Sequence, residues 1–160
     1  FCQSLTEDIM TDLTTPITGG CLCGAVRYKA SEPPKSSGYC HCSMCQRWSG
    51  SPAWAAVTFP LAALRITRGE PKFYRSSPRV DRGFCSDCGS SLFVRYPETD
   101  EYCVSVGTLD DAANARPQRH VGIENQLPWF VLSDDLPRIR SDEEPGTPAY
   151  EAAARRHDGR

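Results

Sequence analysis

The chain has 160 residues, of which 39% are hydrophobic, and its 18 basic and 20 acidic residues give a net charge of −2. This length fits a single domain with a modest core, and the balanced charge argues against a nucleic-acid module that relies on a broad basic face. No apolar run reaches the ~18 residues that a membrane-spanning helix needs, so no membrane span is expected.

Nine cysteines give the chain an odd and high count. Glu7, Asp8 and Asp12 interrupt the first residues, which therefore lack the apolar stretch of a signal peptide. The cysteines occur as C-x-C, C-x-C-x-x-C and C-x-x-C, spacings that suit metal ligation better than disulfide cross-links. These features predict a cytoplasmic protein with reduced thiols. Cys2 and Cys103 have no evident partner, and Cys103 is interpreted as an ordinary strand residue.

The first segment, residues 1–18, carries little pattern and is interpreted as an N-terminal extension, with Met10 as the predicted natural start of the chain. The next segment, G-G-C-L-C-G-A-V-R-Y-K-A at 19–30, alternates in hydropathy and predicts a β-strand. Side chains at every second residue of a strand share a face, so Cys21 and Cys23 are expected to point the same way.

The stretch Y-C-H-C-S-M-C-Q-R-W-S-G at 39–50 packs three cysteines into six residues. Because three thiols cannot all pair with one another as disulfides, we interpret them as ligands of one metal ion. If the first two cysteines, Cys40 and Cys42, are extended, their thiols face one way and His41 faces the other.

A short helix is predicted to follow these two cysteines. Ser43 is expected to cap it, with Gln46 three residues later completing a capping box, and Gly50 is expected to end it. Cys45 then lies in the first helical turn, where the positive end of the helix favours a thiolate.

The remainder of the chain is predicted to form further short strands separated by turns. Asp110 and Asp111 are expected to cap a turn, and the polar segment 140–160 is interpreted as a C-terminal tail. The fold class is therefore mainly β, as a single domain over 19–139 with few short helices. The expected strands are Ala53–Phe59, Leu64–Thr67, Lys72–Arg75, Ser91–Tyr96, Tyr102–Val106 and Arg119–Ile123, and Arg79–Phe84 leads into C-S-D-C-G.

One four-cysteine zinc site is predicted from the spacing of two cysteine pairs. The knuckle Cys85-x-x-Cys88-Gly lets both sulfurs reach one ion, and the C-x-C pair Cys21 and Cys23 would complete a closed structural site. Such a site would stabilise the fold by tying the first strand to the middle of the domain. The alternative joins the two C-x-x-C knuckles in one site and leaves Cys21, Cys23 and Cys40 over.

The remaining cysteines, Cys40, Cys42 and Cys45, would form a three-ligand site with an open position, which is the pattern of catalytic zinc. Three thiolates on a divalent ion give about −1 charge, which suits the capture of a soft thiol better than the production of hydroxide. The alternative is a second closed structural site in which His120 is the fourth ligand.

With these motifs, the chain resembles the glutathione-dependent formaldehyde-activating (GFA) family, whose domain also occurs in centromere protein V. The matching segments are G-G-C-L-C-G-A-V-R-Y at 19–28, C-H-C-S-M-C-Q-R-W-S-G at 40–50, F-C-S-D-C-G-S-S-L-F at 84–93, V-S-V-G-T-L-D-D at 104–111 and the H-V…P-W motif at 120–129.

The resemblance implies a β-tent-like fold of antiparallel sheets and two zinc ions per chain. It also implies a carbon–sulfur lyase that joins glutathione to formaldehyde and gives S-hydroxymethylglutathione. The implied structural ligands are Cys21, Cys23, Cys85 and Cys88, and the implied ligands of the second zinc are Cys40, Cys42 and Cys45.

Applied to these residues, the resemblance predicts small-molecule partners, a thiol and an aldehyde. Arg47 is a candidate cation for the anionic substrate, or an exposed helix arginine. Trp48 and Trp54 are candidate pocket walls, or core residues. His120 is a candidate proton donor or acceptor, or a strand histidine bonded to the backbone. The competing hypothesis is a non-catalytic, zinc-stabilised interaction module, which would have a fourth protein ligand on the second zinc.

Overall fold

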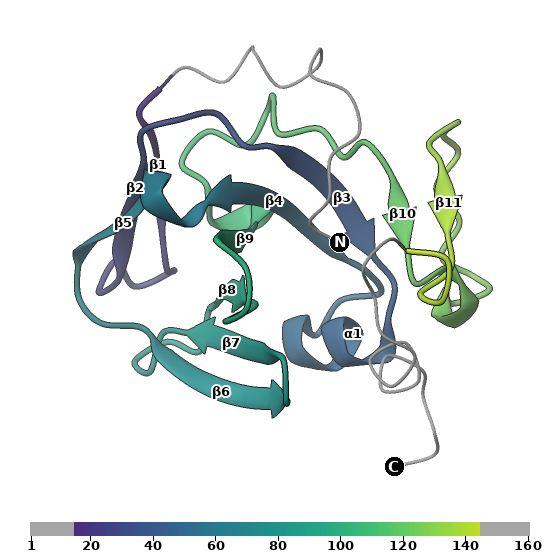
Figure 1. Ribbon diagram of the computed structural model, residues 1–160, viewed down its shortest axis with the longest axis horizontal. Coiled ribbons are helices and arrows are strands. Elements are labelled where there is room, and N and C mark those ends of the chain that lie inside the picture. Colours follow the sequence, from purple (N-terminus) through teal and green to yellow (C-terminus); the bar gives the residue numbers. More distant parts are fainter. Residues whose placement is uncertain (1–14, 145–160) are drawn as a thin grey trace.

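The computed structural model describes residues 15–144 (Figure 1). The predicted start at Met10 and most of the predicted tail at 140–160 lie outside the described residues. Within them, the chain forms eleven strands, one α-helix and three single 3₁₀ turns. The elements are β1 Ile17–Gly20, β2 Arg27–Ala30, β3 Ser36–Cys40, α1 Ser43–Ser49, β4 Trp54–Pro60, η1 Leu61–Ala63, β5 Leu64–Arg68, β6 Lys72–Ser77, β7 Val80–Phe84, β8 Ser91–Arg95, β9 Glu101–Ser105, η2 Val106–Thr108, β10 His120–Val121, η3 Ile123–Asn125 and β11 Arg138–Ile139.

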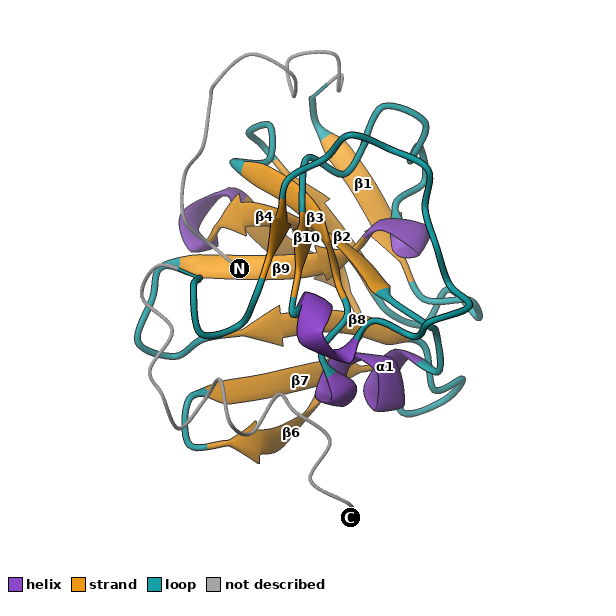
Figure 2. Cartoon of the chain, turned by 90° about the vertical axis from the view of Figure 1, so that its right-hand side faces the viewer, coloured by secondary structure: helices purple, strands orange, loops and turns teal. Residues whose placement is uncertain are grey.

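The strands form two sheets, which confirms the predicted mainly β class. The small sheet has the order β1-β2-β5, and the large sheet has the order β11-β10-β3-β4-β9-β8-β7-β6. Neighbouring strands are antiparallel except that β10 runs parallel to both β3 and β11. Figures 1 and 2 show α1 beside β7. The helix follows β3 in the sequence, so the fold brings together two segments that are distant along the chain.

The single strand predicted for residues 19–30 is wrong, because the chain turns between β1 and β2. Gly24 adopts a φ of +75°, a conformation that favours glycine, and the Cys21 amide donates to the Val26 carbonyl across the turn. Leu22 lies at the tip of this turn and is 89% exposed, whereas Val26 and Tyr28 are buried. Cys21 and Cys23 still face each other, but a turn brings them together.

Two apolar clusters form the core. The larger lies around Tyr28, Phe59 and Phe93, all at most 1% exposed, and each such side chain stabilises the fold by roughly 1.5–3 kcal/mol on burial. The smaller surrounds the cysteines of 40–45 and includes Cys103, which is buried in β9 as predicted.

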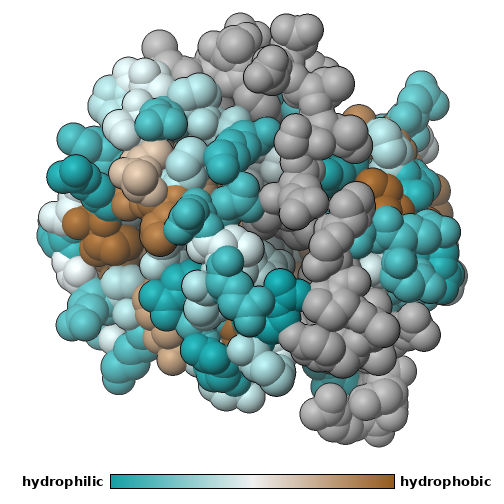
Figure 3. Space-filling model, in the orientation of Figure 1, coloured by the Kyte–Doolittle hydropathy of each residue, from teal (hydrophilic) through white to brown (hydrophobic). Residues whose placement is uncertain are grey.

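The small sheet is covered on one face only. Its outer strand β5 is exposed beyond Leu64, and Ile66 within it is 42% exposed. Apolar colour accordingly appears over the small sheet on the left of Figure 3, amid a mostly hydrophilic face. Among residues 15–144, no helix combines the length and apolar character needed to cross a membrane.

Candidate metal centres

Four cysteines from two distant turns meet at the first candidate metal centre, which we call the four-cysteine centre. Cys21 and Cys23 lie in the turn after β1, and Cys85 and Cys88 lie in the turn after β7. The Sγ atoms are within 4.8 Å of one another, with 3.5 Å between Cys21 and Cys23 and 3.8 Å between Cys23 and Cys85. Zinc–sulfur bonds of ≈ 2.3 Å in a tetrahedron place sulfurs about 3.8 Å apart, so this cluster fits one zinc ion.

Ser90 ties the two halves of this centre together. Its Oγ accepts a hydrogen bond from the Leu22 amide (3.0 Å) and lies 3.2 Å from Cys88 Sγ. Hydrogen bonds from Ser90 lower the pKa of Cys88 to about 5, which favours the thiolate form that a metal binds.

Three further cysteines form the second candidate metal centre, which we call the three-cysteine site. Cys40 ends β3, Cys42 precedes α1 and Cys45 lies in its first turn. Their sulfurs are within 4.8 Å of one another, and the residues are only 2–5% exposed. The structure thus separates the seven cysteines into sets of four and three, and it does not join the two C-x-x-C knuckles. Three thiols at this spacing fit a zinc ion with one position left open.

The predicted cap of α1 is wrong by one residue. Cys42, not Ser43, is the N-cap: its backbone is extended and its Sγ accepts the Cys45 amide at 3.4 Å. Gln46 forms no capping box, because its Nε2 donates to the carbonyls of His41 (2.8 Å) and Asn125 (2.9 Å). One sulfur therefore both caps the helix and joins the cluster.

The predicted end of α1 is confirmed. Gly50 is the C-cap in the left-handed conformation, with φ of 67°, and its amide donates to the Gln46 carbonyl. The helix is held between these two caps for only seven residues.

A buried arginine that no sequence motif marks contacts the three-cysteine site. Arg82, in β7, is 3% exposed, and its Nη1 and Nη2 lie 3.6 and 3.7 Å from Cys45 Sγ. The guanidinium also lies 5.2 Å from the centroid of the Trp48 ring. By contrast, Arg47, the candidate cation from the sequence, is exposed on α1.

The three thiols of this site share protons unequally. Hydrogen bonds from Cys40 and Cys42, together with the charge of Arg82, lower the pKa of Cys45 well below its usual range. The same contacts with Cys40 and Cys45 raise the pKa of Cys42, because adjacent thiolates repel one another. A divalent ion would remove this repulsion by drawing all three thiolates to itself.

Neither His41 nor His120 belongs to a metal-ligating cluster of the described residues. The described arrangement therefore does not bring His120 to the three thiols as a fourth ligand. Both rings are completely buried, and they stack on each other with centroids 5.1 Å apart.

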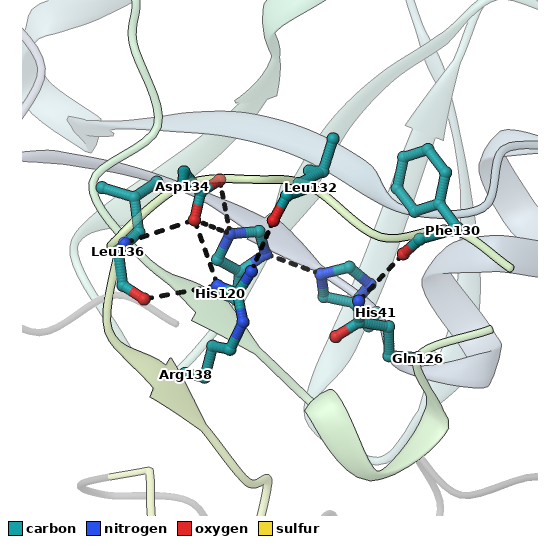
Figure 4. Close-up of polar contacts among 8 residues, drawn as sticks. All are labelled: His41, His120, Gln126, Phe130, Leu132, Asp134, Leu136 and Arg138. Atoms are coloured by element: carbon teal, nitrogen blue, oxygen red, sulfur yellow. Dashed lines mark hydrogen bonds and ion pairs between the residues drawn. The ribbon is translucent and has the colours of Figure 1, made fainter. Parts of the chain in front are cut away.

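The two histidines form a hydrogen-bonded chain that leads to Asp134 (Figure 4). His120 Nε2 lies 3.0 Å from Asp134 Oδ2, and His120 Nδ1 lies 2.8 Å from His41 Nε2. Because the carboxylate only accepts, His120 carries its proton on Nε2, and His41 must then donate from its own Nε2. The remaining Nδ1 of His41 is an acceptor, buried without a partner in the described residues. The sequence does not predict this series of hydrogen bonds, because 79 positions separate the two histidines and only the fold brings them together.

Trp48 and Trp54 pack edge to face beside the three-cysteine site, with centroids 5.2 Å apart. Trp54 is 4% exposed, and its Nε1 donates to Ser105 Oγ at 2.8 Å. It also lines a cavity of about 510 Å³ that extends to Cys88, and the described residues of its wall are mostly serines, glycines and alanines, with no charged side chain among them. Trp54 is thus both a core residue and a pocket wall.

The carboxylates predicted to cap a turn divide between two roles. Asp111 Oδ1 accepts the Ala113 amide at 3.2 Å, as expected of a turn cap. Asp110 instead pairs with Arg27 and accepts a hydrogen bond from Thr18 Oγ1, joining the turn to the small sheet.

The sequence is similar to one protein family and to several named proteins. The sequence model of a family described as glutathione-dependent formaldehyde-activating enzyme matches residues 16–125. A Schizosaccharomyces pombe protein named as an uncharacterized lyase is 38% identical over 129 residues, covering 78% of this chain and 91% of that protein. A Halomonas elongata protein that carries the name of a putative glutathione-dependent formaldehyde-activating enzyme is 28% identical over 126 residues, covering 72% of this chain and 80% of that protein.

A crystal structure of a Rhodobacter sphaeroides protein is also similar. It is 28% identical, covers 58% of this chain and 87% of its own, and superposes with a TM-score of 0.48.

Proposed function

The chain belongs to the glutathione-dependent formaldehyde-activating enzyme family, and we propose that it is a carbon–sulfur lyase that joins a thiol, glutathione first of all, to a small aldehyde such as formaldehyde. Family membership supports an enzyme of the lyase type. The observation that carries the proposal for this chain is the three-cysteine site, where three buried thiols meet and no described histidine or carboxylate joins them.

Two zinc ions per chain are part of the proposal, one in each cysteine cluster. Cys21, Cys23, Cys85 and Cys88 would hold a structural ion, since four ligands close the tetrahedron. At Cys40, Cys42 and Cys45, a bound zinc would supply an open position for the substrate thiol and favour its thiolate.

The reaction needs the residues of the site to bring a thiolate to an aldehyde and to exclude water. The thiol gives up its proton, and the thiolate sulfur attacks the aldehyde carbon to form a C–S bond. The C=O π electrons move to the oxygen, which takes up one proton, so the adduct contains all the atoms of the thiol and the aldehyde. Burial of the three cysteines, which are 2–5% exposed, limits competition from water. The same steps in reverse split the adduct.

The competing hypothesis, a zinc-stabilised interaction module, expects a fourth protein ligand at the second zinc. The described residues offer none within the cluster, which favours the enzyme.

The domain that we propose covers 19–139, although β1 already begins at Ile17.

The proposal is tested with Cys42→Ser in the zinc-loaded protein, using exchange NMR of ¹³C-formaldehyde and glutathione to measure adduct formation above the spontaneous rate. Serine is a good N-cap, so α1 should be retained while one metal ligand is lost. We expect loss of the protein-dependent rate with little change in circular dichroism.

Cys103→Ser is the matched control, because Cys103 is equally buried but belongs to neither cluster. It should keep the rate. A wild-type protein that holds two zinc ions without accelerating the reaction would show that the site is not catalytic for this pair of substrates.

A further inference from the structure

Arg82 is a buried cation without a carboxylate partner among the described residues. Its Nε donates to Ser76 Oγ at 3.1 Å, and its two Nη atoms face the sulfur of Cys45. A guanidinium keeps its proton in proteins, and a charge removed from water needs an opposite charge nearby. The sulfur cluster is the anion that the structure offers to it.

The nearest carboxylate in sequence, that of Asp81, is already bound. It accepts hydrogen bonds from Arg75 and from Arg95 (2.7 Å to Oδ2). Because consecutive residues of a strand point to opposite faces, Asp81 serves one face of β7 while Arg82 faces α1 and the three-cysteine site.

Resting on the proposed function, we infer that Arg82 is the counter-cation of the three-cysteine site and determines its affinity for the anionic thiol substrate. Three thiolates and a divalent ion sum to about −1, so the arginine makes the site neutral. An incoming thiolate then approaches a site with no net charge. Without Arg82 the site would carry about −1 and would repel the thiolate.

The two Nη atoms of Arg82 place its positive charge beside one of the three cysteines, Cys45. Both atoms converge on Cys45 Sγ, and hydrogen bonds from a cation to an anion are among the stronger ones. Arg82 therefore acts as a positioning residue through Cys45, and it need not touch the substrate.

The test compares zinc-loaded wild type with Arg82→Met, Arg82→Lys and Arg47→Met, with Arg65→Met as a control that removes an exposed charge from β5. Two readouts are independent of turnover. Native mass spectrometry under increasing chelator counts zinc ions per chain, with the four-cysteine centre as internal reference. Calorimetric titration with glutathione gives the affinity for the thiol.

We expect Arg82→Met to lose the second zinc at lower chelator concentration, and to bind glutathione about 10- to 100-fold more weakly, as a lost unit charge nearby implies. Arg82→Lys keeps the charge and should recover most of both losses. Arg47→Met and Arg65→Met should resemble wild type in zinc retention. Equal behaviour of Arg82→Met and wild type in both readouts would overturn the inference, as would losses in Arg82→Lys as large as those in Arg82→Met.

The two readouts separate this inference from the proposed function. If wild type binds no glutathione, the proposed function fails, and zinc retention still decides the role of Arg82. If Arg82→Met does not fold, Arg82→Gln, which removes the charge and keeps a polar side chain, replaces it in both readouts: losses in Arg82→Gln that Arg82→Lys does not share support the charge role, and wild-type behaviour of Arg82→Gln overturns it.

Discussion

The polar groups around the three-cysteine site are fixed by partners that lie far away in the sequence. Arg82 reaches Cys45 across 37 positions, and His41 reaches His120 across 79. Single residues of these kinds are common in strands, so nothing in the local sequence marks them. They become recognisable only when the fold shows that each is buried and has one charged or hydrogen-bonding partner.

The histidine chain has a consequence for the dependence of stability on pH. Burial, followed by the proximity of His120 and Arg138, lowers the pKa of His41 to about 4, against ~6.5 for an unfolded histidine. Between these values the unfolded chain binds a proton that the folded chain does not. Stability from this residue is therefore full above pH 6.5 and is lost as the pH falls toward 4.

We predict that acidification from pH 7 to pH 5 destabilises the wild type by about 2 kcal/mol more than it destabilises His41→Gln. Urea unfolding at both pH values with excess zinc measures the difference. Excess zinc limits the contribution of thiolate protonation, which both proteins share. An equal loss in the two proteins would mean that His41 does not hold its pKa below that of the unfolded chain.

At the scale of elements, the strands can be predicted and the turns between them only in part. The predicted ranges locate β4 to β9 to within about two residues. Hydropathy alternation misleads at residues 19–30, where Cys21 and Cys23 are positioned by a cluster of cysteines rather than by a sheet. Spacing predicts which cysteines form a pair, because C-x-C and C-x-x-C restrict how far two sulfurs can separate. It leaves two ways to combine the pairs into metal sites, and the fold selects one of them.

The strand β10 supports the three-cysteine site through its end. Gly122 follows it with φ of +68°, and a Cβ there would lie 2.9 Å from the Cys42 amide nitrogen. The backbone of β10 thus packs directly on the segment that carries Cys42.

We predict that Gly122→Ala weakens zinc binding at the three-cysteine site. Gly50→Ala is the matched control, since Gly50 has φ of +67° but no described atom within 4 Å of the place that an added Cβ would take. Both variants should lose roughly 1–2 kcal/mol of stability for the left-handed conformation, by thermal unfolding. Only Gly122→Ala should also lose the second zinc in native mass spectrometry. Equal zinc retention in the two variants would show that the backbone at Cys42 can move away from the added Cβ without weakening zinc binding.

At the scale of the whole molecule, the four-cysteine centre joins the small sheet to the large one. Cys21 and Cys23 follow β1 of the small sheet, while Cys85 and Cys88 lie between β7 and β8 of the large sheet. A metal bound there cross-links residues 62 positions apart, as Cys23 and Cys85 are. Its binding free energy is therefore part of the folding free energy.

We predict that Cys88→Ser, unlike Cys42→Ser, unfolds the protein. Domains of this size are stable by only about 5–15 kcal/mol, and binding of structural zinc supplies apparent free energies of ≈ 10–16 kcal/mol in zinc-finger peptides. Circular dichroism and thermal unfolding should show loss of cooperative structure for Cys88→Ser, with Cys103→Ser as the control for a buried cysteine. A cooperative transition at the wild-type temperature would show that the centre does not stabilise the fold.

The cysteines of the three-cysteine site lie close together in the sequence, whereas those of the four-cysteine centre lie far apart. This difference has a consequence while the chain is being synthesised. Cys40, Cys42 and Cys45 are synthesised together, before Arg82 and Cys88 are added to the chain. A nascent chain that ends before β7 therefore carries these three thiols together with Cys21 and Cys23, but it has neither Arg82 nor the second half of the four-cysteine centre. The three-cysteine set is therefore the first complete group of ligands along the chain, and the arrival of β7 and the turn after it brings both Arg82 and the last two cysteines of the four-cysteine centre.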